Sequence, residues 1–172
     1  MRRRRGRLAL GLTVAILVLA ADQASKMAVL AQLRPPGETA TPFAAAPLAV
    51  LPVLDFSLVW NRGISFGLGN VPAAWSDIGF GVVAAVIALL LLRWMARTRS
   101  ALLAFALGLV VGGALGNLAD RVRFGAVVDF LYVHVGSFDW WPAFNLADSA
   151  ICVGAVLLGI DSLSARRDWH RY

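Results

Sequence analysis

Charged residues are scarce in this sequence. They make up 15% of its 172 residues, whereas hydrophobic residues make up 59%, and the mean hydropathy is +0.73. A soluble domain usually holds about 25% charged residues. The composition therefore excludes an ordinary water-soluble protein and favours a chain surrounded by lipid, and the length allows a single domain.

Cysteine and histidine are also nearly absent. The one cysteine, Cys152, cannot form a disulfide within the chain, and the two histidines, His134 and His170, are isolated from each other. No Cys or His spacing typical of a metal centre occurs. We therefore expect neither a disulfide scaffold nor a metal site built on histidine.

Four apolar stretches are long enough to cross a membrane, which takes about 20 residues in a helix. They are residues 8–33, 74–94, 101–119 and 143–163. The first also resembles a cleavable secretory signal, because arginines precede an apolar run that ends at Ala20 and Ala21. We favour a retained span, because apolar character resumes after Lys26 and three more spans follow. The sequence thus predicts a mainly α membrane protein with four transmembrane helices.

Basic residues are distributed unevenly between the two sides of these spans. Eleven of the sixteen Lys and Arg residues, with two of the ten acids, lie in the two tails and the connection between the second and third spans. That side carries +9 and the other side −3. Cytoplasmic segments are the ones enriched in Lys and Arg, so both termini are predicted to be cytoplasmic. This distribution accounts for the net charge of +6, and no nucleic-acid partner is implied.

Two segments then lie outside the cytoplasm, residues 34–73 and 120–142. The first opens with a loop rich in Pro and Ala, and residues 55–61 alternate between apolar and other side chains, which is typical of a strand. Residues 127–135 are β-branched and aromatic and suit a second strand. We expect a small extracytoplasmic sheet that lies on the helices.

Polar residues in three of the spans fall at one depth, near the outer interface, given a rise of 1.5 Å per residue. They are Asp22, Lys26, Asn117, Asp120, Arg121, Asn145 and Asp148. Within each span they are three or four residues apart and so share a helix face. Gly112, Gly113 and Gly116 would let another helix approach the third span closely. The pattern predicts a polar pocket between helices that opens toward the outer leaflet.

Several of these residues have a simple structural explanation. Asp22 and Lys26 suit an ion pair within the first span. Asp120 lies beside Arg121 at a helix end, where a structural pair or a cap is the simplest role. The asparagines suit hydrogen-bonding supports, since an amide does not titrate.

Asp148 differs, because no cation lies three or four residues away on its own helix. Unless a partner from another element compensates, burial is therefore expected to raise its pKa. Asp129 is the second candidate for a specific role, because it lies in an apolar run, although a loop cap would also explain it. These arguments leave Asp120 open as a third reactive acid.

Five motifs occur in order along the chain. They are DQASK at 22–26, NRGISF at 61–66, GNLADR at 116–121, VVDF at 127–130 and FNLADS at 144–149. Each motif alone is weak evidence for a family, but the five motifs in this order and at this spacing are specific evidence. Over nearly its whole length, the chain resembles the bacterial lipoprotein signal peptidases, also called signal peptidase II.

The resemblance implies an aspartic endopeptidase that removes signal peptides from diacylglyceryl-modified prolipoproteins, cleaving before the lipidated cysteine. It implies a catalytic pair formed by Asp129 and Asp148, with no metal or organic cofactor. Residues that would support catalysis or contact substrate are Asn61, Gly63, Asn117, Arg121, Asn145, Asp22, Lys26 and Asp120. Many members of the family have small residues where Arg62, Ile64 and Ser65 stand here, so the substrate contacts of this loop are expected to differ.

The resemblance also implies a location in the bacterial inner membrane, with membrane lipid as a partner and the active site near the outer face, and we expect a monomer. A second class of function is a small transporter subunit or a binding protein without catalysis. That class predicts polar groups at the bilayer midplane or on both sides of it. The inner halves of the four spans are nearly free of charge, which favours the protease.

Overall fold

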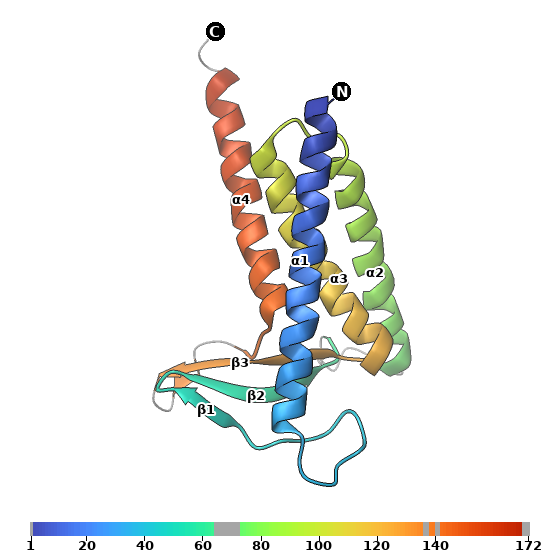
Figure 1. Cartoon of the computed structure of the whole chain (residues 1–172), viewed down its shortest axis with the longest axis vertical. Coiled ribbons are helices and arrows are strands. Elements are labelled where there is room, and N and C mark those ends of the chain that lie inside the picture. Colours follow the sequence, from blue (N-terminus) through green and yellow to red (C-terminus); the bar gives the residue numbers. More distant parts are fainter. Residues whose placement is uncertain (1, 64–72, 136–137, 140–141, 170–172) are drawn as a thin grey trace.

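The computed structural model describes residues 2–63, 73–135, 138–139 and 142–169. Its elements in chain order are α1 (Arg2–Leu33), β1 (Leu48–Leu51), β2 (Leu54–Asn61), α2 (Ala73–Met95), α3 (Ala101–Phe124), β3 (Val127–Val135), β4 (Phe138–Asp139) and α4 (Leu146–Trp169). The four helices stand side by side, and the strands lie across one end of the bundle (Figure 1). The start of α1 and the end of α4 lie together at the opposite end. This confirms the mainly helical fold with a small sheet.

The helices present apolar side chains outward along their length. Ile16 on α1, Leu89 on α2 and Leu163 on α4 are each about 65% exposed. Among the described residues, three helical segments are long and apolar enough to cross a membrane: Arg4–Leu33, Ala101–Phe124 and Leu146–Leu163. In α2, the described apolar stretch is the shorter segment Gly81–Met95. Such a surface is stable in lipid rather than in water.

The helix bounds differ from the predicted spans by more than one residue at four ends, one of which is the end of α4, at Trp169 instead of 163. α1 begins at Arg2 and runs without a break through Ala20 and Ala21, the place where a signal would be cleaved. α3 continues to Phe124 and α4 begins only at Leu146. Hydropathy locates the lipid-crossing part of a helix, whereas backbone hydrogen bonds decide where the helix itself ends.

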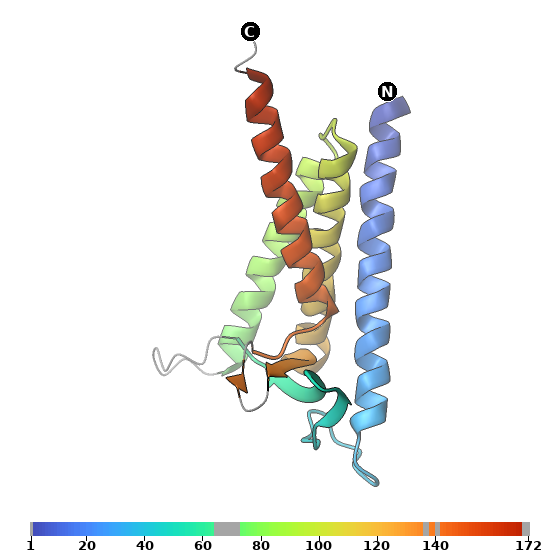
Figure 2. The same cartoon turned by 90° about the vertical axis from the view of Figure 1, so that its left-hand side faces the viewer.

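α3 packs against each of the other three helices, and Figure 2 shows α1 and α2 on opposite sides of it. Glycines make this possible. A Cβ on Gly112 would lie 2.6 Å from the Ala15 carbonyl oxygen of α1, and one on Gly113 would lie 2.5 Å from the Ala147 carbonyl oxygen of α4. The predicted close approach of other helices to this span is therefore confirmed.

The sheet is antiparallel in the order β1-β2-β3-β4, and the predicted strands at 55–61 and 127–135 are confirmed. Gly125 ends α3 in the left-handed conformation, with φ 66°, and β3 follows two residues later. In the β2–β3 register, Val59 lies opposite Asp129 and Asn61 lies opposite Val127. Asn61 is thus a diagonal neighbour of Asp129, within reach of its side chain.

An apolar cluster attaches the sheet to the ends of the helices. Leu30 of α1, Phe43 of the loop and Val128 of β3 are buried together, and Trp60 of β2 packs against them. The Trp60 ring also donates a hydrogen bond from Nε1 to the Phe43 carbonyl oxygen at 2.8 Å. Because Val128 precedes Asp129, this packing holds the position of Asp129 at the helix ends.

Candidate active site

A buried group of three charges connects α1 to α3. Lys26 Nζ lies 2.9 Å from Asp22 Oδ2 and 2.7 Å from Asp120 Oδ2, and all three side chains are at most 2% exposed. The Asp22–Lys26 pair was predicted. The partner of Asp120 was not predicted correctly, because its cation is Lys26, on another helix, rather than the adjacent Arg121.

The two carboxylates of this group also bind backbone of the elements that follow. Asp22 Oδ1 accepts a hydrogen bond from Ala147 N at 3.0 Å, and Asp120 Oδ2 accepts one from Val128 N at 3.1 Å. Gln23, which the sequence analysis did not single out, donates to Asp120 Oδ1 at 2.9 Å. The triad therefore positions the start of α4 and the start of β3, and Asp120 serves as part of this framework.

Asn145 caps α4 rather than lying on its face. Asn145 Oδ1 accepts from Asp148 N at 2.9 Å, and Asp148 Oδ2 accepts from Asn145 N at 3.2 Å. This is the reciprocal pattern of a capping box, in which the residue before the helix and its third residue satisfy each other's amides. The prediction that both lie on one helical face was wrong, because α4 begins after Asn145. The three-residue spacing from Asn145 to Asp148 is the spacing of this capping box.

The amides of Asn145 and Asn117 connect the two candidate carboxylates. Asn145 Nδ2 donates to Asp129 Oδ1 at 2.7 Å and lies 3.1 Å from Asn117 Oδ1. Asn117 Nδ2 donates to Asp148 Oδ1 at 2.8 Å, and Asn117 Oδ1 accepts from Lys26 Nζ at 3.0 Å. Asp129 and Asp148, from β3 and α4, are thus held by one hydrogen-bond network that extends back to the buried triad.

Asp129 is the buried acid of the two, with 2% of its surface exposed. Its Oδ2 accepts a hydrogen bond from Asn61 Nδ2 at 2.9 Å. Burial, with the nearby charge of Asp148, raises its pKa from 3.8 to about 6, against the lowering effect of its hydrogen bonds with Asn61 and Asn145. Burial was expected at Asp148, which instead is only half-buried, because it lies in the first turn of α4 beside a pocket.

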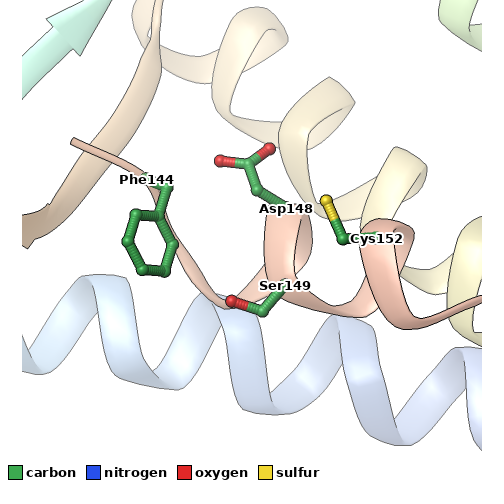
Figure 3. A pocket seen from close by; sticks show the side chains of 4 residues that line it. All are labelled: Phe144, Asp148, Ser149 and Cys152. Atoms are coloured by element: carbon green, nitrogen blue, oxygen red, sulfur yellow. The ribbon is translucent and has the colours of Figure 1, made fainter. Parts of the chain in front are cut away.

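That pocket has a volume of about 260 Å³ and is lined by Phe144, Asp148, Ser149 and Cys152. In the view of Figure 3, the Asp148 carboxylate lies between the Phe144 ring and the Cys152 sulfur, which is one turn along α4. Phe144 and Cys152 were not among the residues predicted for this site. The four-residue spacing from Asp148 to Cys152 could have predicted that Cys152 lies beside Asp148, since it places both residues on one helix face. The Asp148 carboxyl is therefore accessible from an open, mainly apolar space.

Gly63 fixes the orientation of the Asn61 amide. It has φ 92°, a conformation that favours glycine, and its N–H donates to Asn61 Oδ1 at 2.9 Å. With its oxygen so occupied, Asn61 presents Nδ2 to Asp129. The following loop residues 64–72, including Ile64 and Ser65, lie outside the described residues, while Arg62 is exposed.

Arg121 lies beside this network without joining it. Within the part of the chain that the structure describes, its Nη1 donates to the Asn117 carbonyl oxygen at 3.4 Å, and its Nε is buried with no hydrogen-bond partner. Among the described residues, no group of three or more His, Cys, Asp or Glu is placed to hold a metal ion. The network therefore holds two carboxyls from different elements in place through linked amide donors, and Arg121 has donors left for a ligand.

Comparison with known proteins identifies the family. The family model described as signal peptidase (SPase) II matches residues 14–164. The lipoprotein signal peptidase of Methylorubrum extorquens (strain PA1) is 44% identical over 163 residues, covering 89% of this chain and 85% of the relative. That of Burkholderia mallei (strain SAVP1) is 41% identical over 162 residues, with 92% and 90% covered.

The chain belongs to the signal peptidase II family. It is a multi-pass membrane protease of that family. A solved bacterial membrane enzyme, determined by the in meso method at 1.9 Å resolution, has the same fold, with a TM-score of 0.72 and 26% identity over 89% of this chain and 92% of that one. A second such structure, at 2.3 Å resolution, has a TM-score of 0.71.

Substitutions at Asn145 separate two contributions to this signal peptidase. Asn145→Ser keeps a side-chain oxygen that caps α4, whereas Asn145→Ala loses the cap, at a cost of about 1 kcal/mol. Both lose the amide that donates to Asp129. We expect both variants to lose activity, but only Asn145→Ala to unfold at a lower temperature in detergent. Full activity in Asn145→Ser would contradict a positioning role for the amide.

Proposed function

We propose that Asp129 and Asp148 are the catalytic pair with which this signal peptidase removes the signal peptide from diacylglyceryl-modified prolipoproteins, cleaving before the lipidated cysteine. One observation carries the assignment: two acids from different elements are linked by one hydrogen-bonded pair of amides, in which Asn145 donates to Asp129 and to Asn117, and Asn117 donates to Asp148. The raised pKa of Asp129 supports it. Asp120, the third acid, is occupied by Lys26 and by the backbone of β3.

The chemistry follows from two carboxyls that share a site. Because like charges disfavour double ionisation, the pair retains one proton in the pH range where isolated carboxyls have lost theirs. Because burial raises the pKa of Asp129, this residue is the one of the pair that holds the proton. The ionised carboxyl takes a proton from water as the water oxygen attacks the scissile carbonyl, and the protonated carboxyl donates to the carbonyl oxygen. Collapse of the tetrahedral intermediate then breaks the C–N bond, and a proton passes to the leaving amine.

The surroundings of the pair suit a lipid-anchored substrate. The pocket beside Asp148 adjoins Phe144 and Cys152, and the apolar helix surfaces lie in lipid. Each acyl CH₂ buried in the bilayer contributes about 0.8 kcal/mol to membrane affinity. The diacylglyceryl chains can therefore bring the cleavage site to the depth of Asp129 and Asp148 without a large protein interface.

We further propose that both termini are cytoplasmic and that the catalytic pair lies near the outer face of the bacterial inner membrane. The distribution of Lys and Arg supports this orientation, and the start of α1 and the end of α4 lie at the end of the bundle opposite the sheet. We expect a monomer, because one chain supplies both carboxyls and their supporting amides. Light scattering of the detergent-solubilised protein tests this.

The activity is expected to depend on pH through the shared proton. With a pKa of about 6 at Asp129, kcat/KM should fall about tenfold for each pH unit above that value, as the pair becomes fully ionised. The measurement is initial cleavage rate at low substrate concentration from pH 5 to 8. The residual activity of Asn145→Ser should show this alkaline limb at higher pH, because the amide that the substitution removes lowers the pKa of Asp129.

The raised pKa of Asp129 also makes the stability of the folded protein depend on pH. Since the folded-state pKa of Asp129 is raised, its stabilising contribution is present below about pH 4 and is lost as pH rises through about 6. The unfolding temperature of wild type minus that of Asp129→Asn should therefore fall across this window. A difference that rises with pH would contradict the assigned direction.

The decisive test of function is cleavage by the purified full chain. Wild-type protein in detergent is incubated with a diacylglyceryl-modified prolipoprotein and, as matched control, with the unmodified precursor. We expect only the first to yield a mature product with a free N-terminus at the lipidated cysteine. Binding of the lipidated precursor without cleavage would instead favour a non-catalytic binding protein.

A further inference from the structure

A second pocket lies away from the carboxyl pair, between the sheet-side ends of α1 and α3. Its volume is about 220 Å³, and its lining includes Met27, Leu30, Ala31 and Phe124 together with two arginines, Arg34 and Arg123. Arg34 directly follows α1, and Arg123 lies in the last turn of α3. None of these residues belongs to the hydrogen-bond network of the proposed active site. An apolar pocket at this level of the bundle thus carries two cationic groups.

Arg34 is held rigidly at this pocket. Its Nη1 donates to the carbonyl oxygens of Glu38 and Ala40 at 3.3 and 2.9 Å, and its Nη2 donates to Thr41 Oγ1 at 2.9 Å. The guanidinium also lies 4.3 Å from the centre of the Phe43 ring. An arginine has five N–H donors, so two remain for a ligand. The side chain is therefore already ordered before any ligand arrives.

Arg123 lies over the Phe124 ring, 4.8 Å from its centre. In the described part of the chain, neither Arg34 nor Arg123 forms an ion pair with a carboxylate. The acid on the neighbouring loop, Glu38, accepts a hydrogen bond from Ala40 N at 2.7 Å. Among the described residues, two arginine charges thus border one pocket without forming an ion pair with a carboxylate.

Arg34 and Arg123 lie at an unusual position for basic residues. In the proposed orientation they lie on the side where Lys and Arg are usually depleted. Lys26, another basic residue on that side, is buried between two carboxylates, whereas Arg34 and Arg123 form no ion pair within the described part of the chain. A negatively charged group from the surroundings is the missing partner, and at this depth the available anions are lipid headgroups.

We propose that this pocket binds the phosphate headgroup of an anionic phospholipid of the outer leaflet. Arginine is well suited to phosphate, because its planar N–H groups match pairs of phosphate oxygens, and basic pockets between membrane helices bind anionic headgroups in this way. The glycerol and first acyl carbons contact Met27, Ala31 and Phe124. A lipid with a headgroup amine binds less well, because that amine meets the second arginine.

The test is a lipid titration of the purified full chain, followed by native mass spectrometry from maltoside micelles. Phosphatidylglycerol is compared with phosphatidylcholine of identical acyl chains, and glycerol 3-phosphate is added as a soluble competitor. We expect phosphatidylglycerol to bind more tightly than phosphatidylcholine, and Arg123→Gln to weaken it about fivefold. Ala31→Phe, which fills the apolar part and keeps both arginines, should also weaken it.

Arg99→Gln is the matched control, because it removes one exposed arginine at the opposite end of the bundle and should leave lipid binding unchanged. Equal binding of the two lipids, or an equal loss in Arg99→Gln and Arg123→Gln, would overturn the proposal. Displacement of the lipid by an equal concentration of glycerol 3-phosphate would show a free-anion site instead. Peptidase activity is measured separately, so these outcomes are independent of the catalytic assignment.

Discussion

Replacing either Asp129 or Asp148 by asparagine is expected to lower the turnover of lipidated prolipoprotein by on the order of a thousandfold. Asparagine has nearly the shape of aspartate and can still accept one of the hydrogen bonds from Asn145 or Asn117. It cannot take a proton from water or hold the shared proton. The loss should therefore appear in kcat, while the protein still folds and inserts.

The measurement combines a cleavage assay with thermal unfolding in the same detergent. Asp55→Asn is the matched control: Asp55 is an acid of the same sheet, on β2, where its carboxylate lies 3.4 Å from His134 Nε2, outside the proposed active site. We expect this control to keep turnover within about twofold, as is usual for surface substitutions. Retention of a tenth or more of wild-type turnover in either catalytic variant would refute the proposed pair.

Lys26→Met is expected to destabilise the protein by about 3–5 kcal/mol, the typical cost of breaking a buried ion pair from one side. The substitution leaves Asp22 and Asp120, both at most 1% exposed, without their shared cation. It also removes the hydrogen bond from Lys26 Nζ to Asn117. Activity should therefore fall as well, because Asn117 supports Asp148.

Chemical or thermal unfolding in micelles measures this cost. The informative comparison is Lys26→Met in a background of Asp22→Asn and Asp120→Asn, where no buried carboxylate is left unpaired. There the lysine substitution should cost much less, since neutralising both partners removes the uncompensated charge. A cost below about 1 kcal/mol for Lys26→Met alone would show that the triad does not hold α1, α3 and the start of β3 together.

The sequence by itself determined the features that depend on local spacing. Helical segments appear where apolar runs are long enough to cross lipid, and strands appear at 54–61 and 127–135, where side chains alternate or are β-branched. The Asp22–Lys26 pair also follows locally, because residues four apart on a helix face each other. The common depth of the polar residues was computable from the helical rise, and the structure brings them together as predicted.

The tertiary structure alone decided partners and burial. Asp120 is paired with Lys26 of α1 rather than with its sequence neighbour Arg121, and Asp129 rather than Asp148 is the buried acid. Asn145 holds Asp129 because α4 begins one residue after it, so that its amide faces β3. Each of these outcomes depends on which distant segment packs nearby. A local pattern states which face of an element is polar, but only the packed fold determines what that face meets and how much water it loses.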